Sequence, residues 1–195
     1  IPFENKGDKE DDYYAYSITS EVISDVANAG IIRVASLKQV EELGDITIEQ
    51  KAKKLDVRYI TTGTLWKVDS IFQLSMELYD TEASKIIWSE SWEKPWIELA
   101  SIKGNYADNI INQLKVSNNQ YISNASTFNI EAYEYYLKAK FRYKKRKNIE
   151  DKAIAIGLLQ KAIKLDDNLI LAKLYLSVIY FQSGSIDIAK ENTLV

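Results

Sequence analysis

Apolar positions in the first quarter of the chain switch between extended and helical spacing. The opening residues "IPFE" predict a short strand, and residues 11–30 place Tyr14, Ile18 and Val22 on one helical face before a stop at Gly30. Residues 31–36, "IIRVAS", are rich in β-branched side chains and predict a second strand. A polar helix is expected over residues 47–56, with Thr47 as its N-cap. The pattern therefore predicts a β-α-β-α unit.

Three alternating stretches follow, at residues 58–68, 72–82 and 85–93. Their short separations predict consecutive strands joined by tight turns, with Leu74, Met76 and Leu78 on one face. Residues 96–116 then show apolar positions along one side of a helix. We expect a first domain over residues 1–116, with a mixed α/β fold in which helices flank a sheet.

Residues 117–128 are polar, rich in Asn and Ser and without periodicity, which predicts a linker. Residues 129–195 are helical in pattern throughout, with helices expected over 130–146, 149–166, 168–184 and 186–195. Ala155 and Ala189 lie 34 residues apart, each early in the second helix of a pair. This spacing resembles the tetratricopeptide repeat.

Further positions match that motif. In the second unit they are Leu176, Ser177, Tyr180, Gly184 and Ala189, and in the first they are Ala155, Leu159, Ala162, Ile163 and Leu165. Asp167 stands where the motif usually has proline. The match implies about one and a half repeats, truncated, in a chain that we expect to continue beyond Val195. The alternative is an ordinary helical hairpin with a coincidental spacing.

The first domain resembles the TolB amino-terminal-like domain of bacterial signalling proteins. The matching stretches are Pro2, Phe3 and Asn5, then Tyr14 to Glu21, Val57 to Gly63, Leu78 to Thr81, and Trp88 to Glu90. Tyr16 and the pair Glu82-Ala83 depart from the family pattern, at positions where it has glycine. In that family, tetratricopeptide units commonly follow this domain. An adenylate/guanylate cyclase, a winged-helix domain or a protein kinase often precedes it.

Charge and composition narrow the partners and the location. A net charge of −3 and a pI near 5.2 provide no basic field, so we expect no nucleic-acid partner. No apolar run approaches the ~18 residues of a membrane span, so we expect no direct membrane insertion. The absence of cysteine is compatible with reducing and oxidising compartments. We predict a cytoplasmic location, or a periplasmic one if a transmembrane segment precedes Ile1.

Catalytic chemistry has little support in the sequence. The chain has no His and no Cys, the usual general base and thiol nucleophile. Its acidic clusters, at residues 8–12, 41–42 and 166–167, fall at expected loops or helix starts, where carboxylates are favoured without any catalytic role. We expect no catalytic residues, no metal site and no cofactor. The basic run at 140–148 is interpreted as a helix end with its aromatic residues in the core, and the four tryptophans as packing residues.

The function predicted from these observations is that of a non-catalytic sensory or protein-interaction segment, with a protein or peptide partner. The candidate peptide-binding residues, at helical spacing, are Leu171, Leu174, Val178, Phe181 and Gln182. Packing of this strip on the preceding helix pair is the alternative. A homodimer through residues 170–195 is also expected, because an incomplete repeat exposes an apolar edge. Two other functions remain open: a fragment of a cyclase with its catalytic domain upstream, and a small-ligand-binding module.

Overall fold

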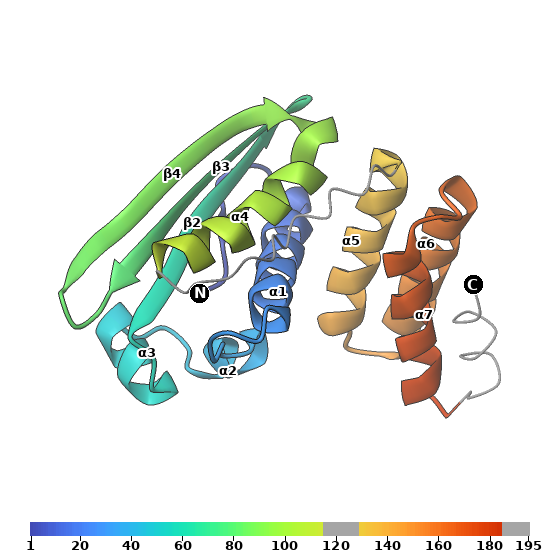
Figure 1. Ribbon diagram of the computed structural model, residues 1–195. Coiled ribbons are helices and arrows are strands. Elements are labelled where there is room, and N and C mark those ends of the chain that lie inside the picture. Colours follow the sequence, from blue (N-terminus) through green and yellow to red (C-terminus); the bar gives the residue numbers. More distant parts are fainter. Residues whose placement is uncertain (115–128, 185–195) are drawn as a thin grey trace. The chain divides into compact units, whose positions relative to one another are not determined.

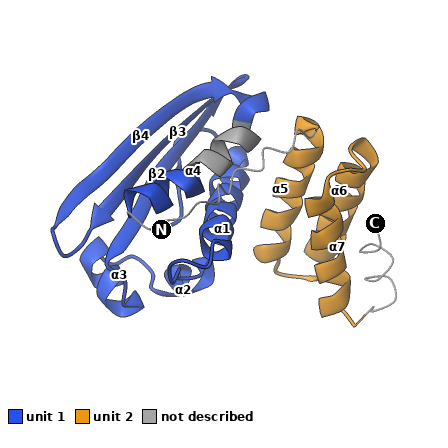
Figure 2. Cartoon of the chain, in the orientation of Figure 1, with its two compact units in different colours: residues 1–126 blue, residues 127–195 orange. Residues whose placement is uncertain are grey.

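The computed structural model describes residues 1–114 and 129–184, and of residues 99–105 only the backbone. The chain divides into two compact units, residues 1–126 and 127–195 (Figure 2).

The first unit is built on a four-stranded sheet in the order β1-β2-β3-β4 (Figure 1). Its strands are β1 (Glu4–Asn5), β2 (Tyr59–Val68), β3 (Ile71–Asp80) and β4 (Lys85–Pro95). The last three form an antiparallel meander, whereas β1 runs parallel to β2. Leu65 pairs with Leu74, and Leu74 pairs with Trp92, so the alternation in the three sequences places apolar side chains on a common face.

Helices α1 (Asp12–Asn28) and α4 (Leu99–Gln113) pack together on one face of this sheet (Figure 1). The short helices are η1 (Lys9–Asp11), α2 (Leu37–Glu42), α3 (Ile48–Leu55) and η2 (Trp96–Glu98). Pro95 ends β4 and the expected long helix begins as a 3-10 turn, so its α-helical part is shorter than residues 96–116. The coarse prediction of a mixed α/β unit with flanking helices is confirmed.

The core of the first unit lies between the sheet and these two helices. Buried side chains from the sheet and from the two helices meet there: Leu65, Phe72, Leu74, Met76, Leu78, Tyr14, Ile18, Tyr106 and Ile110. The Trp92 ring lies edge-on to Tyr106 with 4.5 Å between the ring centroids, and Trp96 lies 4.5 Å from Tyr14. These tryptophans pack between helix and sheet, as predicted. Trp66 differs, because it lies on the opposite face and is 48% exposed.

The N-terminal strand is attached to both the sheet and α1. The Phe3 amide donates to the Thr19 hydroxyl at 2.8 Å, and that hydroxyl donates to the Ala15 carbonyl within α1. The Phe3 ring lies against Gly63 of β2, where an added Cβ would stand 2.9 Å from the ring and 2.8 Å from the Ser75 carbonyl oxygen. A glycine is needed there because no space remains for a side chain.

The predicted strand over residues 31–36 is wrong, because this stretch has no strand partner and runs as an irregular segment. The outer edge of β2 is paired with β1 at Thr64 and Leu65. The β-branched side chains of Ile32 and Val34 line a cavity instead. Helix α2 follows directly and was not predicted. It begins with a capping box in which the Ser36 amide donates to Gln39 Oε1 and the Gln39 amide donates to Ser36 Oγ.

The second unit contains α5 (Ile130–Lys144), α6 (Ile149–Leu165) and α7 (Ile170–Gln182). Asn129 and Asn148 cap α5 and α6 through their side-chain oxygens. Small residues lie between the helices, with Ala155, Ala162 and Ala172 all fully buried, and these allow close helix packing. Tyr143, in the basic run, is buried as expected. The predicted C-terminal helical segment is thus present, whereas its tetratricopeptide nature stays a prediction.

Several expectations concern residues outside the described ranges. They are the linker at 117–128, the helix at 186–195 and the Ala189 match to the 34-residue spacing. Much of the predicted dimer surface at 170–195 also falls there.

Candidate functional site

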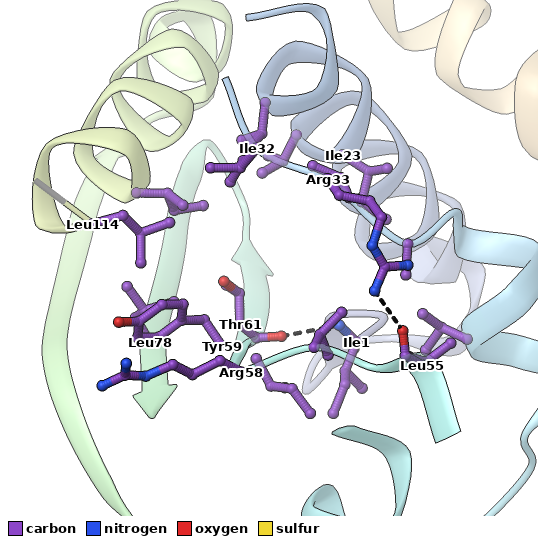
Figure 3. Close-up of a pocket in the computed structure, with 18 of the residues that line it drawn as sticks. Ile1, Ile23, Ile32, Arg33, Leu55, Arg58, Tyr59, Thr61, Leu78 and Leu114 are labelled. Atoms are coloured by element: carbon purple, nitrogen blue, oxygen red, sulfur yellow. Dashed lines mark hydrogen bonds between the residues drawn. The ribbon is translucent and has the colours of Figure 1, made fainter. Parts of the chain in front are cut away.

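The first unit contains a cavity of about 400 Å³ at one end of the sheet (Figure 3). Its walls come from α1, the segment 32–35, the start of β2 and the end of α4, with Leu78 of β3 contributing as well. Aliphatic side chains dominate the lining, among them Val22, Ile23, Ile32, Val34, Ile110 and Leu114. This size and composition are typical of small-molecule sites.

Two backbone features position the cavity walls. Gly30 follows α1 with φ +67°, and this left-handed conformation turns the chain into the segment 31–36. Asp56 ends α3 with φ 53°, which turns the chain into β2. The Arg33 Nη2 donates to the Leu55 carbonyl at 3.0 Å (Figure 3). It also donates to the Asp56 carbonyl, and so joins the segment 31–36 to the end of α3. Hydrogen bonds therefore hold together two of the segments that border the cavity.

Arg58 also contributes to the lining, but its guanidinium is engaged elsewhere. It donates through Nε and Nη2 to both oxygens of Asp80, at 3.1 and 2.8 Å, and its Nη1 lies 3.0 Å from a Glu82 oxygen. The Asp80 side chain is only 6% exposed and also accepts from the Glu82 and Ala83 amides. The hydrogen bonds from Arg58, followed by those from the amides, lower the pKa of Asp80 from 3.8 to about 2.

This shift predicts an acid-dependent loss of stability. A carboxylate with a lowered pKa in the folded state stabilises the fold above its ordinary pKa, and the contribution is lost as the pH falls through the folded value. Asp80→Asn should therefore be less stable than wild type at neutral pH, and the difference should shrink between about pH 4 and pH 2. Urea unfolding across this range measures it. The exposed Asp45→Asn is the matched control; a difference for Asp80→Asn that is constant with pH would contradict the assignment.

The predicted peptide-binding residues lie on one side of α7. Four of them form an apolar strip: Leu171 (36% exposed), Leu174 (46%), Val178 (44%) and Phe181 (65%). The opposite side of α7 is buried through Ala172, Leu176 and Ile179. In the described part of the chain, the strip is therefore surface and not the packed face of the helix. The fifth predicted residue, Gln182, is exposed, and its side-chain oxygen accepts a hydrogen bond from the Tyr143 hydroxyl at 2.9 Å.

The cavity was not located by sequence reasoning. Its walls come from separate stretches of sequence, and the nearest signal, the aliphatic run at 31–34, was interpreted as a strand. Within residues 1–114 and 129–184, no group of three or more His, Cys, Asp or Glu side chains is placed to hold a metal ion. No helix in these ranges has the length and hydropathy needed to cross a bilayer.

Comparison with known proteins gives distant similarities. No protein-family model matches the chain. Putative adenylate cyclase 3 of Rhizobium meliloti (strain 1021) is 24% identical over 119 residues, which make up 60% of this chain and 20% of that protein. The chain thus spans about a fifth of the length of this relative.

Solved structures with some similarity include three bacterial proteins. TolB from Acinetobacter baumannii matches 57% of this chain and 27% of its own, with 16% identity and a TM-score of 0.44. Lipoprotein GNA1162 from Neisseria meningitidis matches 60% of this chain and 94% of its own, with 13% identity and a TM-score of 0.41. PelC from Paraburkholderia phytofirmans matches 60% of this chain and 85% of its own, with 18% identity and a TM-score of 0.40.

Proposed function

We propose that this chain is a non-catalytic protein-interaction segment of a bacterial signalling protein, and that its C-terminal helices bind a protein or peptide in the manner of tetratricopeptide repeats. The observation that carries the proposal is the apolar strip on α7, defined above. Four large apolar side chains that share one helical face and are each more than a third exposed are unusual on a purely solvated surface.

The helix presents this strip in a defined geometry. Its residues follow at spacings of three and four, so they lie on one side of α7, while Leu176 and Ile179 on the other side are buried in the unit. The Tyr143–Gln182 hydrogen bond ties the end of α7 to α5. A rigid helical face with aliphatic and aromatic anchors suits a peptide that presents apolar side chains of its own.

The strip gives a direct mutational test. Random peptides displayed on phage are selected on the purified chain, and the affinity of a selected peptide is measured by fluorescence polarisation. We expect the double change Leu174→Glu and Val178→Glu to weaken binding at least about tenfold, because two apolar contacts are replaced by solvated charges. The circular dichroism melt should stay unchanged, since both side chains are nearly half exposed.

Two controls define the outcome. Gln160→Glu adds a charge at an exposed position of α6 and should leave peptide binding intact. Leu176→Glu buries a charge at a position only 2% exposed and should unfold the second unit. Selected peptides that bind the double variant as well as wild type would refute the proposal. A large loss of stability in the double variant would instead identify the strip as core.

The second candidate is a place within a nucleotide cyclase. The alignment of 119 residues with putative adenylate cyclase 3 favours it. In that case the present chain is still the non-catalytic part, and a catalytic domain lies elsewhere in a longer protein. The two candidates are compatible, because a partner bound by the helices is a means of regulating such an enzyme.

A further inference from the structure

We propose that the cavity in the first unit binds a small monocarboxylate with an aliphatic body, and that Arg33 binds its carboxylate. This inference is independent of peptide binding by α7, because every residue that lines the cavity belongs to the first unit. It starts from the nature of the cavity walls, which are largely Val, Ile and Leu side chains. An aliphatic ligand removes this surface from water at little polar cost.

Two polar side chains of the lining, Thr19 and Arg58, are already engaged by the protein. The Thr19 hydroxyl accepts from the Phe3 amide and donates to the Ala15 carbonyl. Arg58 uses Nε, Nη1 and Nη2 on Asp80 and Glu82. These groups therefore shape the cavity but offer little to a ligand.

Arg33 is different, because only its Nη2 is used, on the Leu55 and Asp56 carbonyls. Within the described residues, its Nε and Nη1 donate to no protein acceptor. Its nearest carboxylate, that of Asp56, lies 3.6 Å from Nη2 and is fully exposed, so water screens this contact. Arg33, whose side chain is 61% exposed, thus stands at the lining with one anchored nitrogen and two unused donor nitrogens, which suit a carboxylate.

Octanoate is a suitable probe, with 1-octanol and n-octylamine as neutral and cationic analogues. Binding is followed through the methyl NMR signals of Ile23, Ile32 and Ile110 at the cavity, with Ile154 of α6 as an internal control. We expect octanoate to shift the three cavity signals saturably at one site and to leave Ile154 unchanged. Octanol should bind more weakly and octylamine weakest of the three.

Variants separate the roles of the charge and of the cavity. Arg33→Gln should weaken octanoate about tenfold, since it removes a charge-assisted hydrogen bond, and should leave octanol unaffected. Lys38→Gln, which removes an exposed charge on α2, should change neither. Ile23→Phe fills the cavity and should abolish binding of both. Ile32→Phe, in the irregular segment, repeats that test if Ile23→Phe lowers the stability of the fold.

Several results would overturn the proposal. They are the absence of saturable shifts, shifts that Ile23→Phe and Ile32→Phe leave intact, and equal binding of octanoate and octylamine. Co-sedimentation with phosphatidylglycerol vesicles tests a membrane lipid as the source of the anionic chain, and we expect none. If the chain binds these vesicles and Arg33→Gln abolishes that binding, the ligand is an anionic lipid and not a free carboxylate. A negative result in any of these tests would leave the proposal of peptide binding by α7 standing.

Discussion

Leu159→Ala is expected to destabilise the second unit by about 2–5 kcal/mol, the range for truncating a buried leucine. Leu159 is fully buried in α6, on the same side of the helix as the buried Ala155 and Ala162. A close-packed interior only partly closes the space that a truncated side chain leaves behind. The unit has only three described helices to supply its core, so this loss is a large part of its stability.

The distribution of tryptophan makes this prediction specific to one unit. All four tryptophans lie between residues 66 and 96, so tryptophan fluorescence reports the first unit. Helical circular dichroism has a major contribution from α5, α6 and α7. Leu159→Ala should shift the dichroism transition in urea and leave the fluorescence transition in place. Ile154→Ala, at a position of the same helix that is 41% exposed, should change stability by less than about 1 kcal/mol. Equal effects of the two variants would contradict the packing described for α6.

The second large effect is expected for Gly63→Ala, which should destabilise the first unit by about 2 kcal/mol. The added Cβ meets the Ser75 carbonyl oxygen at 2.8 Å, and this oxygen belongs to the neighbouring strand and cannot turn aside. The gain from a less flexible unfolded chain is smaller than the cost of this overlap. The tryptophan fluorescence transition in urea should therefore move to lower denaturant.

Gly157→Ala is the matched control for this change. Nothing lies within 4 Å of a Cβ at that helical position, so alanine should stabilise α6 by about 1 kcal/mol. The contact with Phe3 at 2.9 Å can be tested separately, because Phe3→Leu in the Gly63→Ala background should recover part of the loss. A Gly63→Ala variant as stable as wild type would show that the strands move apart more easily than their register implies.

The sheet of the first unit was largely predictable because its signal is local. Alternation in residues 58–93 depends on neighbours two positions apart, and Leu74, Met76 and Leu78 are all buried on the predicted face. The segment 31–36 shows the limit of this reasoning. Its side chains have strand propensity, but a strand also needs a partner strand, and sequence periodicity does not reveal that β1 is the strand that pairs with the outer edge of β2.

The two candidate sites differ in the same way. The apolar strip of α7 lies on one helix, so spacing alone brought Leu174 and Val178 together, and the structure leaves both exposed. The cavity is assembled from α1, the segment 32–35, β2 and α4. Its position depends on two left-handed turns, at Gly30 and Asp56, and only one of these residues is a glycine. A site of this kind emerges from tertiary packing.

The attachment of the N-terminal strand has a consequence for the order of folding. The strands of the meander are joined by the short turns around Asp69 and Ser84, so their contacts close small loops. In contrast, the Ile1 nitrogen reaches the Thr61 carbonyl across a sequence separation of 60 residues. Closing the longer loop loses more chain entropy, and this loss comes before the contacts that offset it have formed. We therefore expect β1 to join the sheet last, with Phe3 packing against Gly63 on a meander that has already formed.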